Sequence, residues 1–91
     1  MTDFKTYNPL KTCKKLYSLS YDKRCGNHDI VISGDGKYFK YHGTIVAYIK
    51  PEKAVICWTA WGDYPSTVRV QNSYKALFVQ DGLNVIDERD R

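Results

Sequence analysis

The chain has 91 residues, of which 43% are hydrophobic, 26% charged and 14% aromatic. These values exclude wholesale disorder, and the length allows one hydrophobic core rather than two. The first ten residues lack the apolar run of a secretory signal, and no stretch approaches the roughly 18 apolar residues of a membrane span. The length therefore predicts one small domain. Because the three cysteines are an odd number and no secretory signal precedes them, we expect reduced thiols in a cytoplasmic compartment.

The net charge of +4 comes entirely from the first quarter of the chain. Residues 1–24 contain six Lys or Arg and two Asp, whereas the remaining residues contain eight charges of each sign. Such a basic segment is typical of proteins that bind nucleic acid or an acidic protein. A lysine-rich segment that only keeps the chain soluble is the competing interpretation.

The N-terminal segment predicts a short helix. Asn8-Pro9 reads as an N-cap followed by proline at the first helical position, with the helix ending near Tyr17. A strand over residues 16–21 competes with it, because polar and apolar residues alternate there.

The stretch from Asp29 to Thr59 predicts a four-stranded antiparallel meander. Its strands are expected over residues 29–33, 37–41, 44–50 and 54–59. The turns are Gly34-Asp35-Gly36, His42-Gly43 and Pro51-Glu52, and Gly43 supplies the positive φ that a two-residue hairpin needs. Two unpaired sheet edges leave a monomer and a homodimer both open.

Hairpin registers sort the strand residues into two faces. Tyr41 is expected opposite Thr44, and Lys50 opposite Lys53. The predicted core face consists of Ile30, Ile32, Tyr38, Ile45, Ala47, Ile49, Ile56 and Trp58. The predicted opposite face consists of Val31, Phe39, Tyr41, Val46, Tyr48, Val55 and Cys57.

The last third of the chain predicts a loop over residues 60–65 and a helix over residues 66–80. Ser66 or Thr67 is the expected cap, and Asp81-Gly82 ends the helix. An apolar stripe recurs at helical spacing in Val70, Tyr74, Leu77 and Phe78. Residues 83–86 suit a short strand, and residues 87–91 a frayed charged tail.

The predicted fold is therefore a single α+β domain over residues 1–91. An antiparallel four-stranded meander (29–59) packs against one C-terminal helix (66–80), preceded by a short N-terminal helical segment within the basic residues 1–24.

Cysteine and histidine are the residue types in this chain that a metal site or a nucleophilic active site would use. Cys25-Gly-Asn-His28 is half of a zinc knuckle, but the second close pair that tetrahedral zinc needs is missing; the possible completions are Cys13, His42 and Cys57. Cys25, His28 and Asp29 form the one local nucleophile arrangement, and no feature of the sequence activates the thiol. Gly34-Asp-Gly36 joins two strands, unlike a phosphate loop. We expect no metal, no cofactor and no catalytic residue.

Aromatic residues mark two candidate binding surfaces. Trp61 and Tyr64, with Arg69 nearby, have the composition of a protein-interface hot spot, and Lys11, Lys14 and Lys15 would add electrostatic support. The alternative is single-stranded nucleic acid on an aromatic sheet face with lysines at the strand ends. Its candidate residues are Phe39, Tyr41, Tyr48, Lys37, Lys50 and Lys53.

Several short motifs resemble those of small bacteriophage-encoded proteins of uncharacterised function. The matching pieces are Gly26-Asn27-His28, Tyr41-His42-Gly43-Thr44, Trp61-Gly62, Ser66-Thr67, Arg69 and Asn72, spread over slightly more than half of the chain. In that family the loop usually reads Gly-Gly-Trp or Gly-Trp, whereas Trp61 precedes Gly62 here. The resemblance implies a phage accessory protein in a bacterial cytoplasm and supplies no functional residue.

Together these patterns predict a binding protein rather than an enzyme. The leading hypothesis is a phage inhibitor or modulator that occupies the surface of a host protein or ribonucleoprotein, such as a CRISPR-type defence complex. Direct binding of single-stranded nucleic acid is the second hypothesis, and a small enzyme using Cys25 and His28 is the third.

Overall fold

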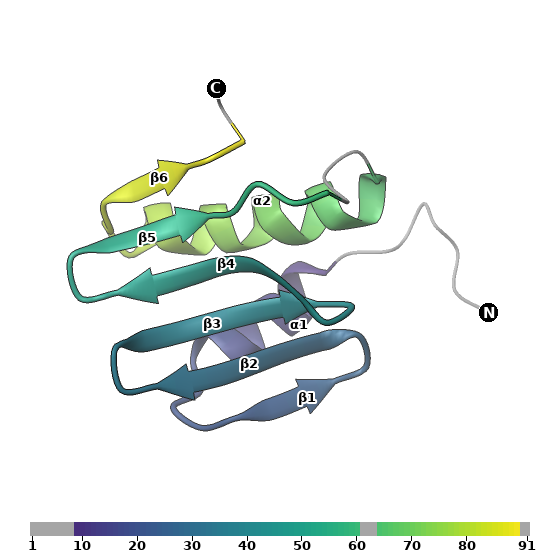
Figure 1. Ribbon diagram of the computed structural model, residues 1–91, viewed down its shortest axis with the longest axis horizontal. Coiled ribbons are helices and arrows are strands. Elements are labelled where there is room, and N and C mark those ends of the chain that lie inside the picture. The colour runs from purple at the N-terminus through teal and green to yellow at the C-terminus, as the bar shows by residue number, and fades with distance from the viewer. Residues whose placement is uncertain (1–8, 61–63, 90–91) are drawn as a thin grey trace.

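The computed structural model describes residues 9–60 and 64–89 and places two helices on one face of a six-stranded sheet (Figure 1). Strands follow one another across the sheet in chain order, from β1 at one edge to β6 at the other. All neighbours are antiparallel except β5 and β6, which are parallel. The elements are α1 (Leu10–Tyr17), β1 (Lys23–Cys25), β2 (His28–Ser33), β3 (Gly36–Tyr41), β4 (Thr44–Lys50), β5 (Lys53–Ile56), α2 (Pro65–Gln80) and β6 (Val85–Asp87).

The predicted α+β class is confirmed, including the short N-terminal helix and the C-terminal helix on the sheet. α1 ends at Tyr17 as predicted, and the competing strand over residues 16–21 does not form. The sheet has two more strands than the predicted meander. β1 forms a hairpin with β2, and β6 joins the far edge after α2 has carried the chain back across the sheet. Both are only three residues long. β6 overlaps the short strand expected over residues 83–86, whereas β1 was not predicted because it is too short for an alternating pattern to be recognised.

The turn after β2 has two residues, not three. Ser33 pairs with Gly36, which is therefore the first residue of β3. A Cβ atom at Gly36 would collide with the carbonyl oxygen of Ile49 on β4, so glycine is required by this close approach. One residue fewer in the turn reverses the face of every β3 side chain relative to β2. The other predicted pairs, Tyr41 with Thr44 and Lys50 with Lys53, are confirmed.

A β-bulge shifts the register between β3 and β4. Lys40 pairs with Ile45 while Phe39 pairs with Ala47, which leaves Val46 as the extra residue. Val46 and Ala47 are both buried as a result. The bulge follows the His42-Gly43 turn, in which both residues have positive φ, 52° and 78°, as a two-residue hairpin turn requires.

These two features make the predicted sorting of the faces wrong for β3 and the start of β4, whereas Ile30, Ala47 and Ile56 lie in the core as predicted. Phe39 and Tyr41 lie in the core, whereas Ile45 and Trp58 are exposed. Tyr38 instead pairs with Val31 and Tyr48, away from the buried row. The residues that meet the helices across β2 to β5 are Ile30, Phe39, Ala47 and Ile56.

α2 closes the core with the predicted apolar stripe, whose four residues are all buried. The ring of Phe39 stacks on Tyr74 with centroids 4.5 Å apart, and Tyr17 of α1 stacks on the same Phe39 at 6.1 Å. The helix begins at Pro65, after Tyr64, so neither Ser66 nor Thr67 is the cap. It ends as predicted, with Gly82 at a φ of 71°.

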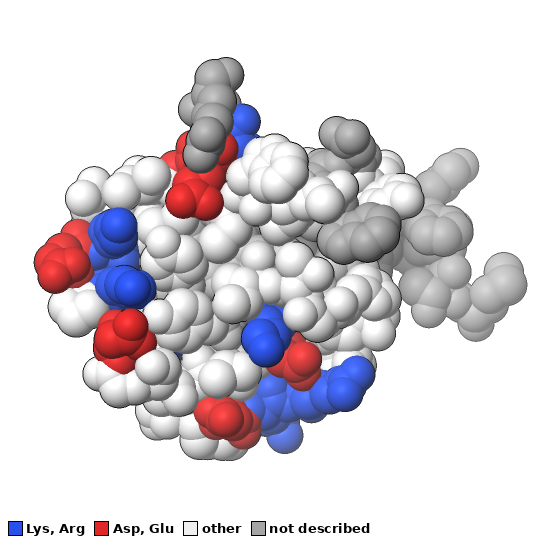
Figure 2. Space-filling view, in the orientation of Figure 1, with Lys and Arg blue, Asp and Glu red and all other residues white. Residues whose placement is uncertain are grey.

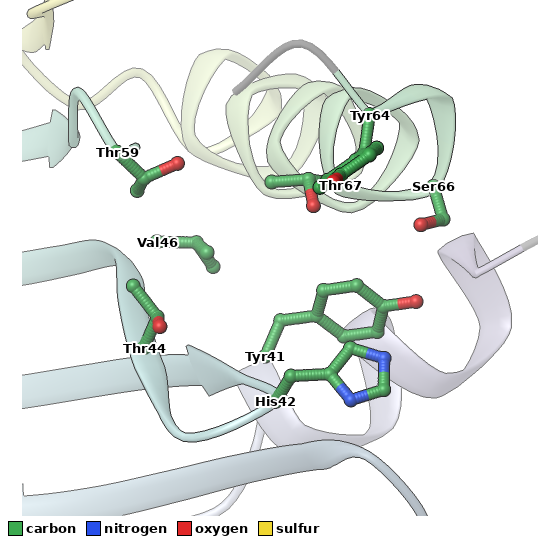
Figure 3. A pocket seen from close by; sticks show the side chains of 8 residues that line it. All are labelled: Tyr41, His42, Thr44, Val46, Thr59, Tyr64, Ser66 and Thr67. Atoms are coloured by element: carbon green, nitrogen blue, oxygen red, sulfur yellow. The ribbon is translucent and has the colours of Figure 1, made fainter. Parts of the chain in front are cut away.

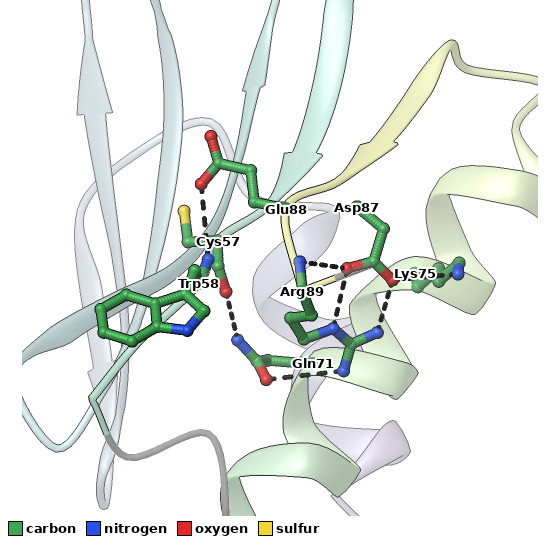
Figure 4. Close-up of polar contacts among 7 residues, drawn as sticks. All are labelled: Cys57, Trp58, Gln71, Lys75, Asp87, Glu88 and Arg89. Atoms are coloured by element: carbon green, nitrogen blue, oxygen red, sulfur yellow. Dashed lines mark hydrogen bonds and ion pairs between the residues drawn. The ribbon is translucent and has the colours of Figure 1, made fainter. Parts of the chain in front are cut away.

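The C-terminal residues 87–89 are held in place rather than frayed. The Asp87 carboxylate accepts hydrogen bonds from Lys75 of α2 (3.0 Å) and from Arg89 (2.8 and 2.9 Å). Gln71 donates to the carbonyl of Cys57 at 2.7 Å and links α2 to the end of β5 (Figure 4). We call Lys75, Asp87 and Arg89 the β6 clamp, because they fasten β6 to α2.

Neither described helix has the length and apolar character needed to cross a membrane.

Candidate functional site

The face of the sheet opposite the helices carries an unbroken row of apolar and aromatic side chains. One residue from each of five neighbouring strands contributes to this outer row, which consists of Val31, Tyr38, Tyr48, Val55 and Ile86. The Tyr38 and Tyr48 rings lie 5.6 Å apart at the centre. Figure 2 views the molecule from this side, where uncharged side chains fill most of the middle. Neither helix covers the row: Val31, Tyr38 and Tyr48 are half-buried and Ile86 is exposed, while Val55 is buried.

Charged residues of both signs flank the outer row. On one side Arg24 faces Asp29 at 3.6 Å, and on the other Lys50 lies 3.5 Å from Asp35. The Tyr38 hydroxyl donates to Asp35 at 3.1 Å, and hydrogen bonds from Ser33 and Tyr38 lower the pKa of that carboxyl. The cations beside the row therefore have anions next to them.

Trp58 is the most exposed of the large hydrophobic side chains that the structure describes. It lies two residues after the end of β5, its side chain is outside the core, and the residue is 65% exposed. Its backbone N–H donates to the Glu88 carboxylate at 3.4 Å, which fixes the chain at this point (Figure 4). Ile45 and Ile86 are also exposed, at 38% and 42%.

A cavity of about 360 Å³ lies between the His42-Gly43 turn and the start of α2. We call it the α2 cavity. Its lining residues are Tyr41, His42, Thr44, Val46, Thr59, Tyr64, Ser66 and Thr67 (Figure 3). Two sequence motifs singled out above, residues 41–44 and Ser66-Thr67, meet at this cavity although they lie far apart in the chain.

Three rings contact one another beside the α2 cavity. The Tyr41 ring lies 4.9 Å from His28 in a tilted arrangement and 4.4 Å from His42 edge-on, measured between centroids. His28 is buried, and this burial lowers its pKa; the nearby His42 lowers it further, while Asp29 acts in the opposite direction. The His28 imidazole is therefore neutral at pH 7.

The residues predicted to contact a protein partner lie in different places. Trp61 lies outside the described residues. Tyr64 is 56% exposed and lines the α2 cavity, while Arg69 is exposed on α2. Lys11, Lys14 and Lys15 are exposed on α1.

The residues predicted to bind nucleic acid do not form one surface. Phe39 and Tyr41 are buried under the helices, while Tyr48 belongs to the outer row. Lys37 donates to the carbonyl of Tyr17 at 3.5 Å, on the helix side of the sheet. Lys50 is paired with Asp35, and Lys53 is half-buried.

The thiols do not gather into a reactive centre. Burial raises the pKa of Cys13 and of Cys57 to about 11, so both are protonated at neutral pH. Cys25 pairs with His28 across β1 and β2. Within residues 9–60 and 64–89, no three His, Cys, Asp or Glu residues group closely enough to hold a metal ion.

Comparison with protein-family models, curated proteins and solved structures finds no match for this chain.

Three residues of the candidate sites were not predicted from the sequence. Tyr38 and Trp58 were assigned to the core, and Thr59 was not considered. A two-residue turn at Gly34-Asp35 would have placed Tyr38 opposite Val31 and so on the outer face. The exposure of Trp58 has no such signal, because it depends on β5 ending at Ile56.

Proposed function

We propose that this chain is a binding protein, not an enzyme, and that a partner protein docks on the outer row. The observation that carries this proposal is the row of apolar side chains across five strands that neither helix covers, with exposed Ile45 on the same face. Exposed Trp58 follows two residues after the end of β5. Aromatic and branched apolar residues at the centre of a surface, with polar residues around them, are the usual anatomy of a protein interface.

The charges favour a protein over nucleic acid on this face. A nucleic-acid groove needs cations free to neutralise phosphates. Here Lys50 has Asp35 beside it and Arg24 has Asp29 beside it. A rim with both signs suits the mixed charges of a protein surface.

The resemblance described above supports a phage accessory role. On that basis the partner is a host protein or ribonucleoprotein complex, possible examples being defence complexes, and binding inhibits or modulates it by covering its surface. Tyr64 and Arg69 lie on the helix side of the sheet and stay predicted protein contacts separate from the outer row.

Capture from a bacterial lysate tests the proposal when matched variants are compared. The tagged chain and its Trp58→Ser variant are each incubated with lysate, with and without nuclease, and bound proteins are identified by mass spectrometry. Val79→Ser is the control, since Val79 is 61% exposed on α2, which packs on the other face of the sheet.

We expect one defined partner that survives nuclease, is retained by Val79→Ser and is lost from Trp58→Ser. Truncation of a hot-spot residue costs about 2 kcal/mol or more, or roughly 30-fold in affinity. Equal capture by both variants, or loss of the captured material on nuclease treatment, would contradict the proposal.

A further inference from the structure

We propose that the α2 cavity binds a carboxylate group carried on an apolar body. This inference goes beyond the docking of a partner on the outer row, because it concerns the opposite side of the sheet and rests on different residues.

The start of α2 supplies donors to this cavity. Val68 donates to the carbonyl of Tyr64 at 3.1 Å, which is the first hydrogen bond of the helix. Pro65 has no N–H, so the orphan donors of the first turn are the backbone N–H groups of Ser66 and Thr67. Neither an N-cap side-chain hydrogen bond nor an acidic residue in the first turn satisfies them among the described residues. The positive end of the helix dipole favours an anion at this position.

Thr59 gives independent evidence for a ligand oxygen. The residue is only 8% exposed, and its Oγ1 has no hydrogen-bond partner among the described residues. Buried hydroxyls nearly always find a partner. The Thr59 hydroxyl is directed into the cavity, on the side facing Thr67 (Figure 3). An oxygen bound at the start of α2 would accept its hydrogen.

The walls of the cavity select the rest of the ligand. Val46 and the rings of Tyr41 and Tyr64 contribute apolar surface, and the volume of about 360 Å³ is at the small end of ligand pockets. A free phosphate ion has no apolar part to fill this space. A carboxylate attached to a ring or a branched chain fits both the donors and the walls. It can come from a free organic acid or from the C-terminal residue of a protein chain.

An NMR titration of the whole chain tests the inference with benzoate as the probe. We expect saturable shifts of the Ser66 and Thr67 amide signals with benzoate. Benzamide has the same shape without the charge and is expected to bind at least about tenfold more weakly, since hydrogen bonds to an ionised acceptor are roughly twice as strong. N-acetylphenylalanine and its amide form a second pair. If N-acetylphenylalanine binds more tightly than benzoate, the natural ligand is the C-terminal residue of a protein chain. If benzoate binds more tightly, it is a free organic acid.

Variants of Thr59 separate a ligand contact from a structural role. Thr59→Val removes the hydroxyl at nearly constant shape and is expected to weaken benzoate by at least about threefold, as the loss of one hydrogen bond does. Thr59→Ser keeps the hydroxyl and is expected to retain binding, while Thr12→Val on α1 is the matched control. Equal binding of benzoate and benzamide would overturn the inference, and so would an absence of shifts at Ser66 and Thr67 or unchanged affinity in Thr59→Val. The titration needs no partner protein, so its failure is distinct from failure of the proposed function.

Discussion

Gly36 fixes the register on which both faces of the sheet depend. We expect Gly36→Ala to lower the free energy of unfolding by about 1–3 kcal/mol, because the new methyl group collides with the backbone of β4. Gly34→Ala is the control: a Cβ there meets no atom within 4 Å, and Gly34 is not among the positive-φ residues. Urea unfolding of both variants measures the difference. Equal stability would show that β4 moves aside at no cost.

His28 gives the fold a dependence on pH. Its pKa in the folded chain is below the ordinary value of 6.5, so the unfolded chain takes up the proton first as pH falls. The contribution to stability is therefore complete above pH 6.5 and is lost progressively below it. We expect the free energy of unfolding to fall from pH 7.5 to pH 5.5, and His28→Phe to remove most of this slope while keeping a ring against Tyr41.

His42 provides the control for this pH dependence. It is exposed at the hairpin turn, and asparagine tolerates its positive φ, so His42→Asn preserves the turn. Urea unfolding at the two pH values should give a slope much closer to wild type for His42→Asn than for His28→Phe, because burial is the larger cause of the lowered His28 pKa and His42 the smaller one. A slope unchanged in His28→Phe would assign the pH dependence to another group.

At the scale of elements, the β6 clamp fastens the last strand to α2. The side chain of Asp87 is 10% exposed, and hydrogen bonds from Arg89 and then Lys75 lower its pKa. Asp87→Ala removes the acceptor and leaves two cations without it, so we expect a loss of about 1.5–3 kcal/mol. Hydrogen exchange of β6 amides should accelerate with it. Asp35→Ala removes an exposed ion-pair partner and should have a much smaller effect. Similar losses in the two variants would contradict a special role for the clamp.

The same elements show what sequence patterns determine here. The apolar stripe of α2 and the His42-Gly43 turn were predictable because each depends on local spacing alone. The faces of β3 were not, since they depend on whether the preceding turn has two residues or three, and Gly34-Asp35-Gly36 suits both. The choice is made by the approach of β4 to Gly36, a contact between residues distant in the chain. The bulge at Val46 has no local signal either.

The same distinction between local and long-range contacts decides which residues of the candidate sites could be predicted from the sequence. Tyr64 was predictable as an exposed ring because it lies in the loop just before a helix, and it does line the α2 cavity. The outer row was not, because it requires the register of five strands, including the three-residue β6. Thr59 is a candidate ligand contact only because the fold buries it next to the start of α2, which the sequence does not indicate.

At the scale of the whole molecule, the two faces of the sheet differ in what they contact. α1 and α2 bury one face around Phe39, while the outer row on the other face has no described element against it (Figure 1). Our central claim is that a partner protein covers the outer row. A second copy of this chain and a nucleic acid are the competing occupants.

Site-specific photocrosslinking distinguishes these occupants most directly. A benzophenone amino acid replaces Tyr48 at the centre of the outer row, or Val79 on the exposed side of α2 as the control, and the tagged chain is irradiated in bacterial lysate. We predict a covalent adduct with one host protein from position 48, resistant to nuclease, and none from position 79. An adduct of twice the mass of the chain, a nuclease-sensitive adduct, or the same host protein attached only at position 79 would contradict the claim.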